Sequence, residues 1–219
     1  MATIQGFIFD LDGVLVDTAR YHFQAWQRLA KQLGIHFTEE ENEQLKGISR
    51  RESLQKILDW GGKTASDAEI EIWMHQKNDW YLELINNMAA DEVLPGVPAF
   101  LESTRQSGLK MALGSASRNA LTILKKVQLE HYFDAIIDGN KTTRSKPDPQ
   151  VFLMAANALD TDPGRLVVFE DAQAGIEAAN TGGFRSIGIG EKNNLKGAEI
   201  VLPGFRNATP ARLINQLNN

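Results

Sequence analysis

The sequence predicts an α/β protein with a doubly wound parallel sheet and an inserted all-helical cap domain. Two observations predict this fold class. Short apolar runs alternate with longer helical patterns over most of the chain, which is the order of strands and crossover helices in a parallel sheet. Residues 19–92 interrupt that order, because they contain helical patterns and no convincing strand. The alternation resumes after them, so this stretch is interpreted as an insertion.

Five apolar runs are predicted to be strands covered on both faces, because they are short and do not alternate with polar residues. They lie at 4–9, 110–115, 135–138, 165–171 and 185–190. Helical patterns at 97–107, 118–129, 149–159 and 172–181 are each long enough to return the chain to the start of a parallel strand. A Rossmann-like core of this kind binds its ligands outside the carboxyl ends of the strands.

The insertion is expected to begin with a helix. Thr18 is placed as its N-cap and Gly34 as its stop, and an apolar stripe at helical spacing lies between them, made of Phe23, Trp26, Leu29, Ala30 and Leu33. Such a stripe is more often the core of a helical domain than a ligand contact. The Pro and Gly residues of 94–98 mark the return to the main domain. We therefore expect a core domain at 1–16 and 93–219, and a cap at 17–92.

The composition narrows the possible partners. The chain has 219 residues, 42% of them hydrophobic, a formal net charge of −5 and no cysteine. The negative charge and the lack of a basic run argue against a nucleic acid or a membrane surface as partner. No stretch approaches the ~18 apolar residues of a membrane-spanning helix. We expect a cytoplasmic monomer that acts on a small molecule.

The stretch FIFDLDGVLVDT, residues 7–18, carries the first chemical signal. Asp10 and Asp12 follow a buried strand, and residues two apart in an extended chain point to the same side. Gly13 then allows a sharp turn. Two carboxylates this close are unfavourable unless a cation or a shared proton offsets their charge. The alternative, two exposed turn aspartates, fits the Asp-Gly turn but not the apolar run before it.

Three other segments place polar groups after predicted strands. Ser115 to Ser117 follow 110–114, Lys146 lies in the loop RSKPDP, and Glu170 and Asp171 end the run LVVFED. Each has an ordinary alternative: a turn serine, a solvated lysine, or acids that complement a helix dipole. Strand ends of a parallel sheet converge on one edge, however, so the four segments are expected to form one site.

The chemistry that this set supports is phosphoryl transfer. Carboxylates supply the hard oxygen ligands that Mg²⁺ prefers. Lysine, hydroxyl and amide donors neutralise charge on phosphate oxygens, and a carboxylate can attack phosphorus in line.

Four features of the sequence resemble, in the same order, the four motifs of the haloacid dehalogenase superfamily. They are FDLDGVL, the serine after the second strand, the lysine of SKPDP and the ED pair. The position of the insertion resembles its helical-cap subgroup. Five further stretches are similar to the sugar-phosphate mutases of that superfamily: DTARYHFQAW, NEQLKGISRRESLQKIL, KNDWY, SASRNA and EDAQAGIEA. The resemblance implies a Mg²⁺-dependent phosphomutase that interconverts β-D-glucose 1-phosphate and D-glucose 6-phosphate through an aspartyl-phosphate enzyme and a glucose 1,6-bisphosphate.

The resemblance also implies roles for the core residues. Asp10 would be the nucleophile, and Asp12 the general acid and base, which requires a raised pKa. The metal ligands would be the Asp10 carboxylate, the Asp12 backbone carbonyl, Glu170 and Asp171. The transferring phosphate would be held by Ser115, the N–H of Ala116, and Lys146.

The cap is expected to decide between mutase and phosphatase. The resemblance implies that the loop Gly47, Ile48, Ser49 and Arg50 grips the phosphate that is not being transferred, with the Arg50 guanidinium as a two-donor fork. The other residues expected to bind substrate are His22, Trp26, Lys77, Ser117, Arg118 and Asn119. Arg118 stands where the family commonly has lysine. The alternatives left open are a sugar-phosphate phosphatase of the same superfamily and, from another class, a non-catalytic sugar-phosphate sensor.

Overall fold

The computed structural model describes residues 3–218 and contains a parallel sheet with the strand order β3-β2-β1-β4-β5-β6. The strands are Gly6–Phe9 (β1), Lys110–Gly114 (β2), Ala135–Ile137 (β3), Leu166–Glu170 (β4), Arg185–Ile189 (β5) and Ile200–Leu202 (β6). The five predicted strands are confirmed, and β6 is an addition. The chain runs outward from β1 to β3 and then continues at β4 on the other side of β1, so the order reverses between β1 and β4. Ligands of such sheets bind at this point.

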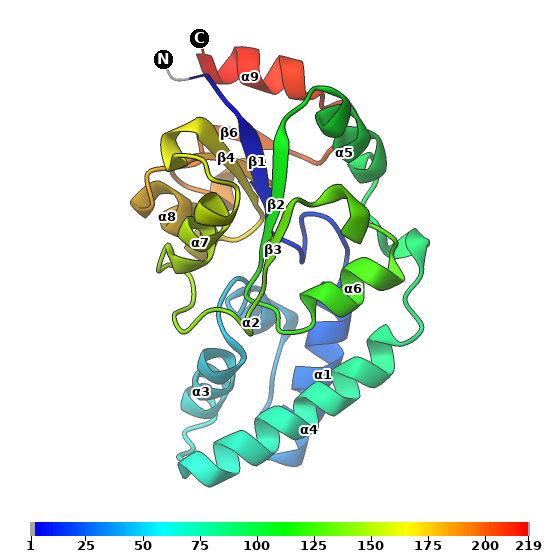
Figure 1. Cartoon of the computed structure of the whole chain (residues 1–219). Coiled ribbons are helices and arrows are strands. Elements are labelled where there is room, and N and C mark those ends of the chain that lie inside the picture. Colours follow the sequence, from blue (N-terminus) through cyan, green and yellow to red (C-terminus); the bar gives the residue numbers. More distant parts are fainter. Residues whose placement is uncertain (1–2, 219) are drawn as a thin grey trace.

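Helices cover both faces of the sheet (Figure 1). They are α5 (Val97–Gln106), α6 (Ala120–Lys126), α7 (Gln150–Ala158), α8 (Gln173–Thr181) and α9 (Pro210–Asn218). Single turns of 3-10 helix lie at Ala90–Glu92 (η1), Glu130–Tyr132 (η2), Pro163–Arg165 (η3) and Lys192–Asn194 (η4). The four helices predicted for the core domain are confirmed with slightly shorter bounds, and α9 is an addition.

Side chains of β1 alternate between two hydrophobic clusters. Phe7 and Phe9 pack with residues of α5, α6 and α9, and the Phe9 ring stacks on Phe169 with 4.9 Å between the ring centroids. Ile8 packs on the opposite face with residues of α7 and α8. A strand buried on both faces needs no polar residue in its alternation, which explains the continuous apolar run in the sequence.

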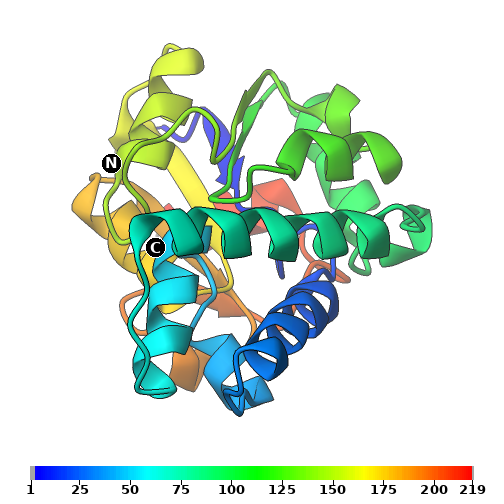
Figure 2. The same ribbon diagram turned by 90° about the horizontal axis from the view of Figure 1, so that it is seen from below.

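The insertion forms a separate layer at the carboxyl ends of the strands, opposite the chain termini (Figure 1). Residues 17–92, all within the described part, contain no strand but four α-helices: α1 (Ala19–Gln32), α2 (Glu39–Glu43), α3 (Arg50–Trp60) and α4 (Asp67–Ile85). Figure 2 shows α4 crossing the whole end of the sheet. The cap has its own hydrophobic cluster, which includes Trp26, Leu29, Leu54 and Ile57.

Three cap helices begin with the same device. The N-cap residues Thr38, Ser49 and Ser66 accept a hydrogen bond from the backbone of the third helical residue, and the glutamates there, Glu41, Glu52 and Glu69, accept one in return. These capping boxes satisfy backbone donors that a helix start leaves free. Helix α1 differs. Thr18 takes the predicted N-cap position, but its side chain makes no capping hydrogen bond.

Within the described residues, no helix combines the length and the apolar character needed to cross a membrane.

Candidate active site

The carboxyl ends of β1 and β4 bring three carboxylates together. Asp10 follows β1, Glu170 ends β4, and Asp171 comes next. One oxygen from each lies within 4.8 Å of the others. Burial and the neighbouring negative charges raise the pKa values of Glu170 and Asp171 above their ordinary values. All three groups therefore lie on the same rim of the sheet, as the sequence predicts.

Lys146 lies among these acids. Its side chain is fully buried, and its Nζ donates hydrogen bonds to Glu170 and, at 2.7 Å, to Asp10. Burial lowers the pKa of Lys146, but the two carboxylates raise it by more, to above its ordinary value. The alternative of a solvated lysine is therefore wrong. Lys46 of the cap adds a second ammonium group, 3.3 Å from Asp171 Oδ2, so two ammonium groups face three carboxylates and the cluster still lacks positive charge.

This donor set fits a hard divalent cation. The three groups are carboxylates, which supply the oxygen ligands that such ions prefer. The pKa values of Glu170 and Asp171 are raised first by burial and then by the neighbouring acids, and a bound cation would offset both costs. Glycines leave room for the acids. A Cβ on Gly175 of α8 would lie 1.9 Å from Glu170 Oε1, and one on Gly13 would lie 2.1 Å from Asp171 Oδ2.

Asp12 has a different environment from Asp10. Burial and the charge of Asp10 raise the pKa of Asp12 to about 6, although Thr18 donates a hydrogen bond to its carboxylate. A carboxyl group with this pKa can both release and accept a proton near neutral pH. Asp10 is only 5% exposed. The alternative of two exposed turn aspartates is therefore wrong.

A cavity of about 340 Å³ lies between the cap and this rim of the sheet. Every residue of the predicted site lines it except Glu170, which is fully buried and contacts Lys146. Ser115 is buried in its wall, and its Oγ accepts a hydrogen bond from the Ser117 amide at 3.1 Å. The serine therefore organises the loop after β2 as well as facing the cavity.

Two arginines approach this cavity from opposite sides. Arg50 starts α3 in the cap, and Arg118 lies in the loop between β2 and α6 of the core. Burial and the charge of Arg118 lower the pKa of Arg50. Both guanidinium groups line the cavity, Arg50 half-buried and Arg118 exposed, so together they could bind an anion there.

Gly47 allows the cap loop before Arg50 to approach the core closely. Its φ is +76°, in the left-handed region that favours glycine. A Cβ there would lie 3.3 Å from the Ala172 Cβ and 3.7 Å from Lys146 Cδ. The loop is therefore packed against the core beside the groups that follow β4.

Helices α1 and α4 of the cap place His22, Trp26 and Lys77 side by side in the cavity. His22 Nδ1 lies 3.1 Å from Lys77 Nζ, and the ammonium nitrogen lies 4.5 Å from the centroid of the Trp26 ring. Burial, followed by the charge of Arg50, lowers the pKa of Lys77 well below its ordinary value. Trp26 belongs to the hydrophobic cluster of the cap and also lines the cavity, so it fits both interpretations of the apolar stripe.

Sequence reasoning missed four contributors to the site. Tyr81 lies one helical turn after Lys77, and its buried Oη has no hydrogen-bond partner within the described residues. Lys46 Nζ lies 3.3 Å from Asp171 Oδ2, and Asn78 accepts a 3.0 Å hydrogen bond from Asn119. Thr18 was expected only as a helix cap. The i, i+4 spacing of Tyr81 and Lys77 was a readable signal, whereas the contacts of Lys46 and Asn78 join segments far apart in sequence.

Comparisons with known proteins agree with this geometry. Residues 7–189 match the model of the family described as haloacid dehalogenase-like hydrolase. The chain is 42% identical to a β-phosphoglucomutase of Bacillus subtilis (strain 168), over 91% of this chain and 89% of that protein. It is 33% identical to a phosphorylated carbohydrates phosphatase of Thermotoga maritima, over 84% of each.

A solved structure shows the same fold. The crystal structure of a β-phosphoglucomutase from Clostridium difficile superposes with a TM-score of 0.95 at 39% identity, covering 99% of this chain and 98% of that one. Its match includes the cap as well as the sheet, because nearly all of both chains is covered. The chain therefore belongs to the haloacid dehalogenase-like hydrolase family.

Proposed function

We propose that this protein is a Mg²⁺-dependent β-phosphoglucomutase that interconverts β-D-glucose 1-phosphate and D-glucose 6-phosphate. The observation that carries the proposal is that one cavity is lined by two groups of side chains, each of which could hold a phosphate. Asp10, Ser115 and Lys146 form the first group, and Arg50 and Arg118 form the second. A mutase must hold a sugar bisphosphate at both ends. The similar proteins from B. subtilis and C. difficile carry the same name.

In the proposed reaction, phosphorylated Asp10 gives its phosphoryl group to a sugar hydroxyl, and Asp12 removes the proton of that hydroxyl. The O–P bond to Asp10 breaks as the new O–P bond forms, so the product is glucose 1,6-bisphosphate. The bisphosphate turns over in the cavity, and Asp10 then attacks the other phosphate. Asp12 returns its proton to the departing sugar oxygen. Asp12, with a pKa of about 6, suits both directions.

The residues around Asp10 prepare it for this exchange. Lys146 would neutralise charge on the transferring phosphoryl oxygens, together with the Ser115 hydroxyl and the Ala116 N–H. Asp10, Glu170, Asp171 and the backbone carbonyl of Asp12 would hold the Mg²⁺ ion. When bound, the ion supplies charge neutralisation between the nucleophile and the phosphate.

The core and the cap have different roles in the proposed reaction. The core, residues 1–16 and 93–219, would carry the phosphoryl-transfer groups, and the cap, residues 17–92, would close over the sugar. Support comes from the separate hydrophobic cluster of the cap and from the lining of the cavity by both parts. His22, Trp26 and Lys77 would contact the sugar from the cap, while Ser117 and Asn119 would assist the second phosphate site.

A single chain supplies all these groups, which supports the proposal that the protein works as a monomer. A cytoplasmic location stays a prediction.

The similarity to the T. maritima phosphatase favours one second candidate, a sugar-phosphate phosphatase. The two activities share the aspartyl phosphate and differ in its acceptor, which is a sugar hydroxyl in a mutase and water in a phosphatase. Incubation with β-D-glucose 1-phosphate, Mg²⁺ and a trace of glucose 1,6-bisphosphate separates them. The proposal expects glucose 6-phosphate as the product, whereas release of inorganic phosphate and free glucose would contradict it. Asp10→Asn serves as the inactive control.

A further inference from the structure

A hydrogen bond between Ser145 and Glu52 joins the core to the cap, and neither residue is a proposed metal ligand or phosphate contact. The hydroxyl of Ser145, in the core loop, donates to Glu52 Oε2, in the first turn of cap helix α3. These residues are far apart in sequence and come together only where the two parts of the chain meet. Both flank proposed phosphate-binding residues: Ser145 precedes Lys146, and Glu52 lies two residues after Arg50.

Glu52 Oε2 also organises the cap loop. It accepts a hydrogen bond of 3.0 Å from the Ser49 N–H and one of 2.8 Å from the Ser49 hydroxyl. A single carboxylate oxygen therefore holds the start of the Arg50 helix and the loop that carries Lys146. Partial burial raises the pKa of Glu52, but the hydrogen bonds from Ser145 and Ser49 lower it by more, so the group is an acceptor at neutral pH.

We propose that Glu52 is a positioning residue that holds the cap closed through Ser145 and so fixes the distance between the two phosphate sites. The proposal rests on the proposed function, because it assigns the contact to the closed state of that reaction cycle. The other side-chain contacts across the cavity involve ligand groups. Lys46 contacts Asp171, a proposed metal ligand, and Asn78 contacts Asn119, a proposed phosphate contact. The hydrogen bond between Ser145 and Glu52 involves neither a proposed metal ligand nor a proposed phosphate contact.

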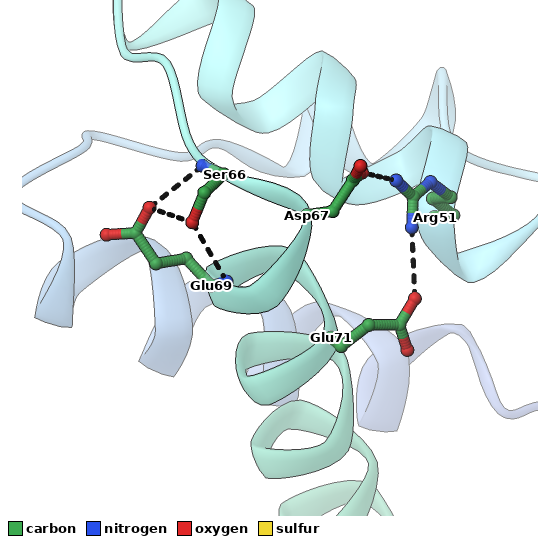
Figure 3. A network of polar contacts seen from close by, with 5 residues as sticks. All are labelled: Arg51, Ser66, Asp67, Glu69 and Glu71. Atoms are coloured by element: carbon green, nitrogen blue, oxygen red, sulfur yellow. Dashed lines mark hydrogen bonds and ion pairs between the residues drawn. The ribbon is translucent and has the colours of Figure 1, made fainter.

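The cap contains a matched control. At the start of α4, Glu69 Oε2 accepts hydrogen bonds of 2.8 Å from the Ser66 N–H and 2.7 Å from the Ser66 hydroxyl, as Figure 3 shows. This capping box has the same residue types as the Ser49 and Glu52 pair, but its hydrogen bonds all lie within the cap. Replacing Glu69 therefore removes the same capping interaction without touching the core.

The experiment measures cap closure directly. The sequence contains no cysteine, so Lys63→Cys in the cap and Arg212→Cys on α9, both exposed positions, can be labelled with a fluorophore pair. Single-molecule energy transfer then gives the ratio of closed to open molecules, without substrate and with glucose 6-phosphate. The variants are Glu52→Ala, Ser145→Ala, their double mutant, Glu69→Ala and Ser145→Thr.

The expected result is a fall of about five-fold in the ratio of closed to open molecules for Glu52→Ala and for Ser145→Ala, the usual worth of one partly exposed hydrogen bond to a charged group. The double mutant falls no further, because both changes remove the same bond. Ser145→Thr restores the ratio, since it keeps the hydroxyl, and Glu69→Ala leaves it unchanged. An unchanged ratio in Ser145→Ala, or an equal fall in Glu69→Ala, would overturn the proposal.

This result is separate from the product assay. A wild-type protein that releases inorganic phosphate refutes the mutase and leaves the energy-transfer result standing. A protein that makes glucose 6-phosphate but shows no coupling between Glu52 and Ser145 refutes only the positioning role.

Discussion

Lys146 Nζ donates a 2.7 Å hydrogen bond to Asp10 from a position with no solvent exposure of its side chain. The same ammonium group also donates to Glu170. The lysine that would neutralise the transferring phosphoryl group thus also compensates two buried acids of the protein. Catalytic and structural roles are combined in one side chain.

Replacing Lys146 with methionine, which keeps most of the volume, should therefore destabilise the protein. Two buried carboxylates would lose their partner, and breaking a buried ion pair costs about 3–5 kcal/mol. We expect a loss of this size in the free energy of unfolding by urea, measured without metal, and partial recovery with Mg²⁺. Lys63→Met, at an exposed position of the cap, is the control. Unchanged stability of Lys146→Met would show that the pair contributes nothing.

Removing one carboxylate of the metal cluster should weaken divalent-ion binding. Asp171→Asn keeps the shape of the side chain but removes its charge, so we expect the dissociation constant for Mg²⁺ to rise about ten-fold or more. At an ion concentration of about 100 times the dissociation constant, the wild-type protein should gain about 2.7 kcal/mol of stability. Titration calorimetry and thermal unfolding measure these effects. Asp91→Asn, an exposed acid, should behave like the wild type, and a variant of Asp171 that also does so would remove this residue from the site.

Neighbouring arginines should differ sharply in function. Arg51 donates to Asp67 and Glu71 of α4, which ties it to the cap (Figure 3). Both arginines line the cavity, but Arg51 is exposed and paired with acids of the cap, whereas Arg50 is half-buried. Arg50→Ala should raise KM for β-D-glucose 1-phosphate by about ten- to a hundred-fold, since charged hydrogen bonds contribute about 1.5–3 kcal/mol. It should change the formation of aspartyl phosphate from acetyl phosphate much less. Arg51→Ala should cost up to about 1 kcal/mol of stability and little in KM, and equal kinetic losses in the two variants would be inconsistent with this assignment.

Asp12→Asn should fold normally and transfer phosphate slowly. The amide cannot exchange a proton with the sugar hydroxyl, and general acid and base catalysis contributes roughly 10²- to 10⁴-fold to such a step. Single-turnover measurement with phosphorylated enzyme isolates this step from binding. A rate within about two-fold of the wild type would assign the proton transfer to another group.

Gly175→Ala should displace the Glu170 carboxylate, because the added methyl group would overlap it. The added methyl carbon would lie 1.9 Å from Glu170 Oε1, so the carboxylate or α8 must move. Alanine favours a helix over glycine by about 1 kcal/mol, which makes a loss of stability here diagnostic of the contact. We expect reduced stability and weaker Mg²⁺ binding. Gly164→Ala, where nothing lies within 4 Å of the added carbon, is the control, and identical behaviour of the two variants would contradict the contact.

The sheet could be predicted from the sequence because its central strands are continuous apolar runs with a polar residue at the end. The edge strand β6 was missed, since Ile200–Leu202 is short and only half-buried. Helix α9 was missed although Leu213 and Leu217 recur at helical spacing and are buried. Helices α2, α3 and α4 of the cap were not predicted individually, although their capping boxes, which place glutamate three residues after serine or threonine, are visible in the sequence.

The position of the site could be predicted because parallel strands bring their carboxyl ends to one rim. Its internal contacts could not. The hydrogen bond from Thr18 to Asp12 removes the side chain of an expected helix cap from that task, and Ser145 meets Glu52 across the boundary of cap and core. The Ser145 and Glu52 pair depends on how the cap lies on the sheet, which local spacing does not encode.

The fate of the phosphoryl group on Asp10 tests the central claim most directly. The protein is first labelled with acetyl [³²P]phosphate and Mg²⁺, and β-D-glucose 1-phosphate is then added. The account predicts that the label is recovered in glucose 1,6-bisphosphate and glucose 6-phosphate, and that Asp10→Asn takes up none. Recovery of the label in inorganic phosphate, at a rate that the sugar phosphate does not change, would contradict it.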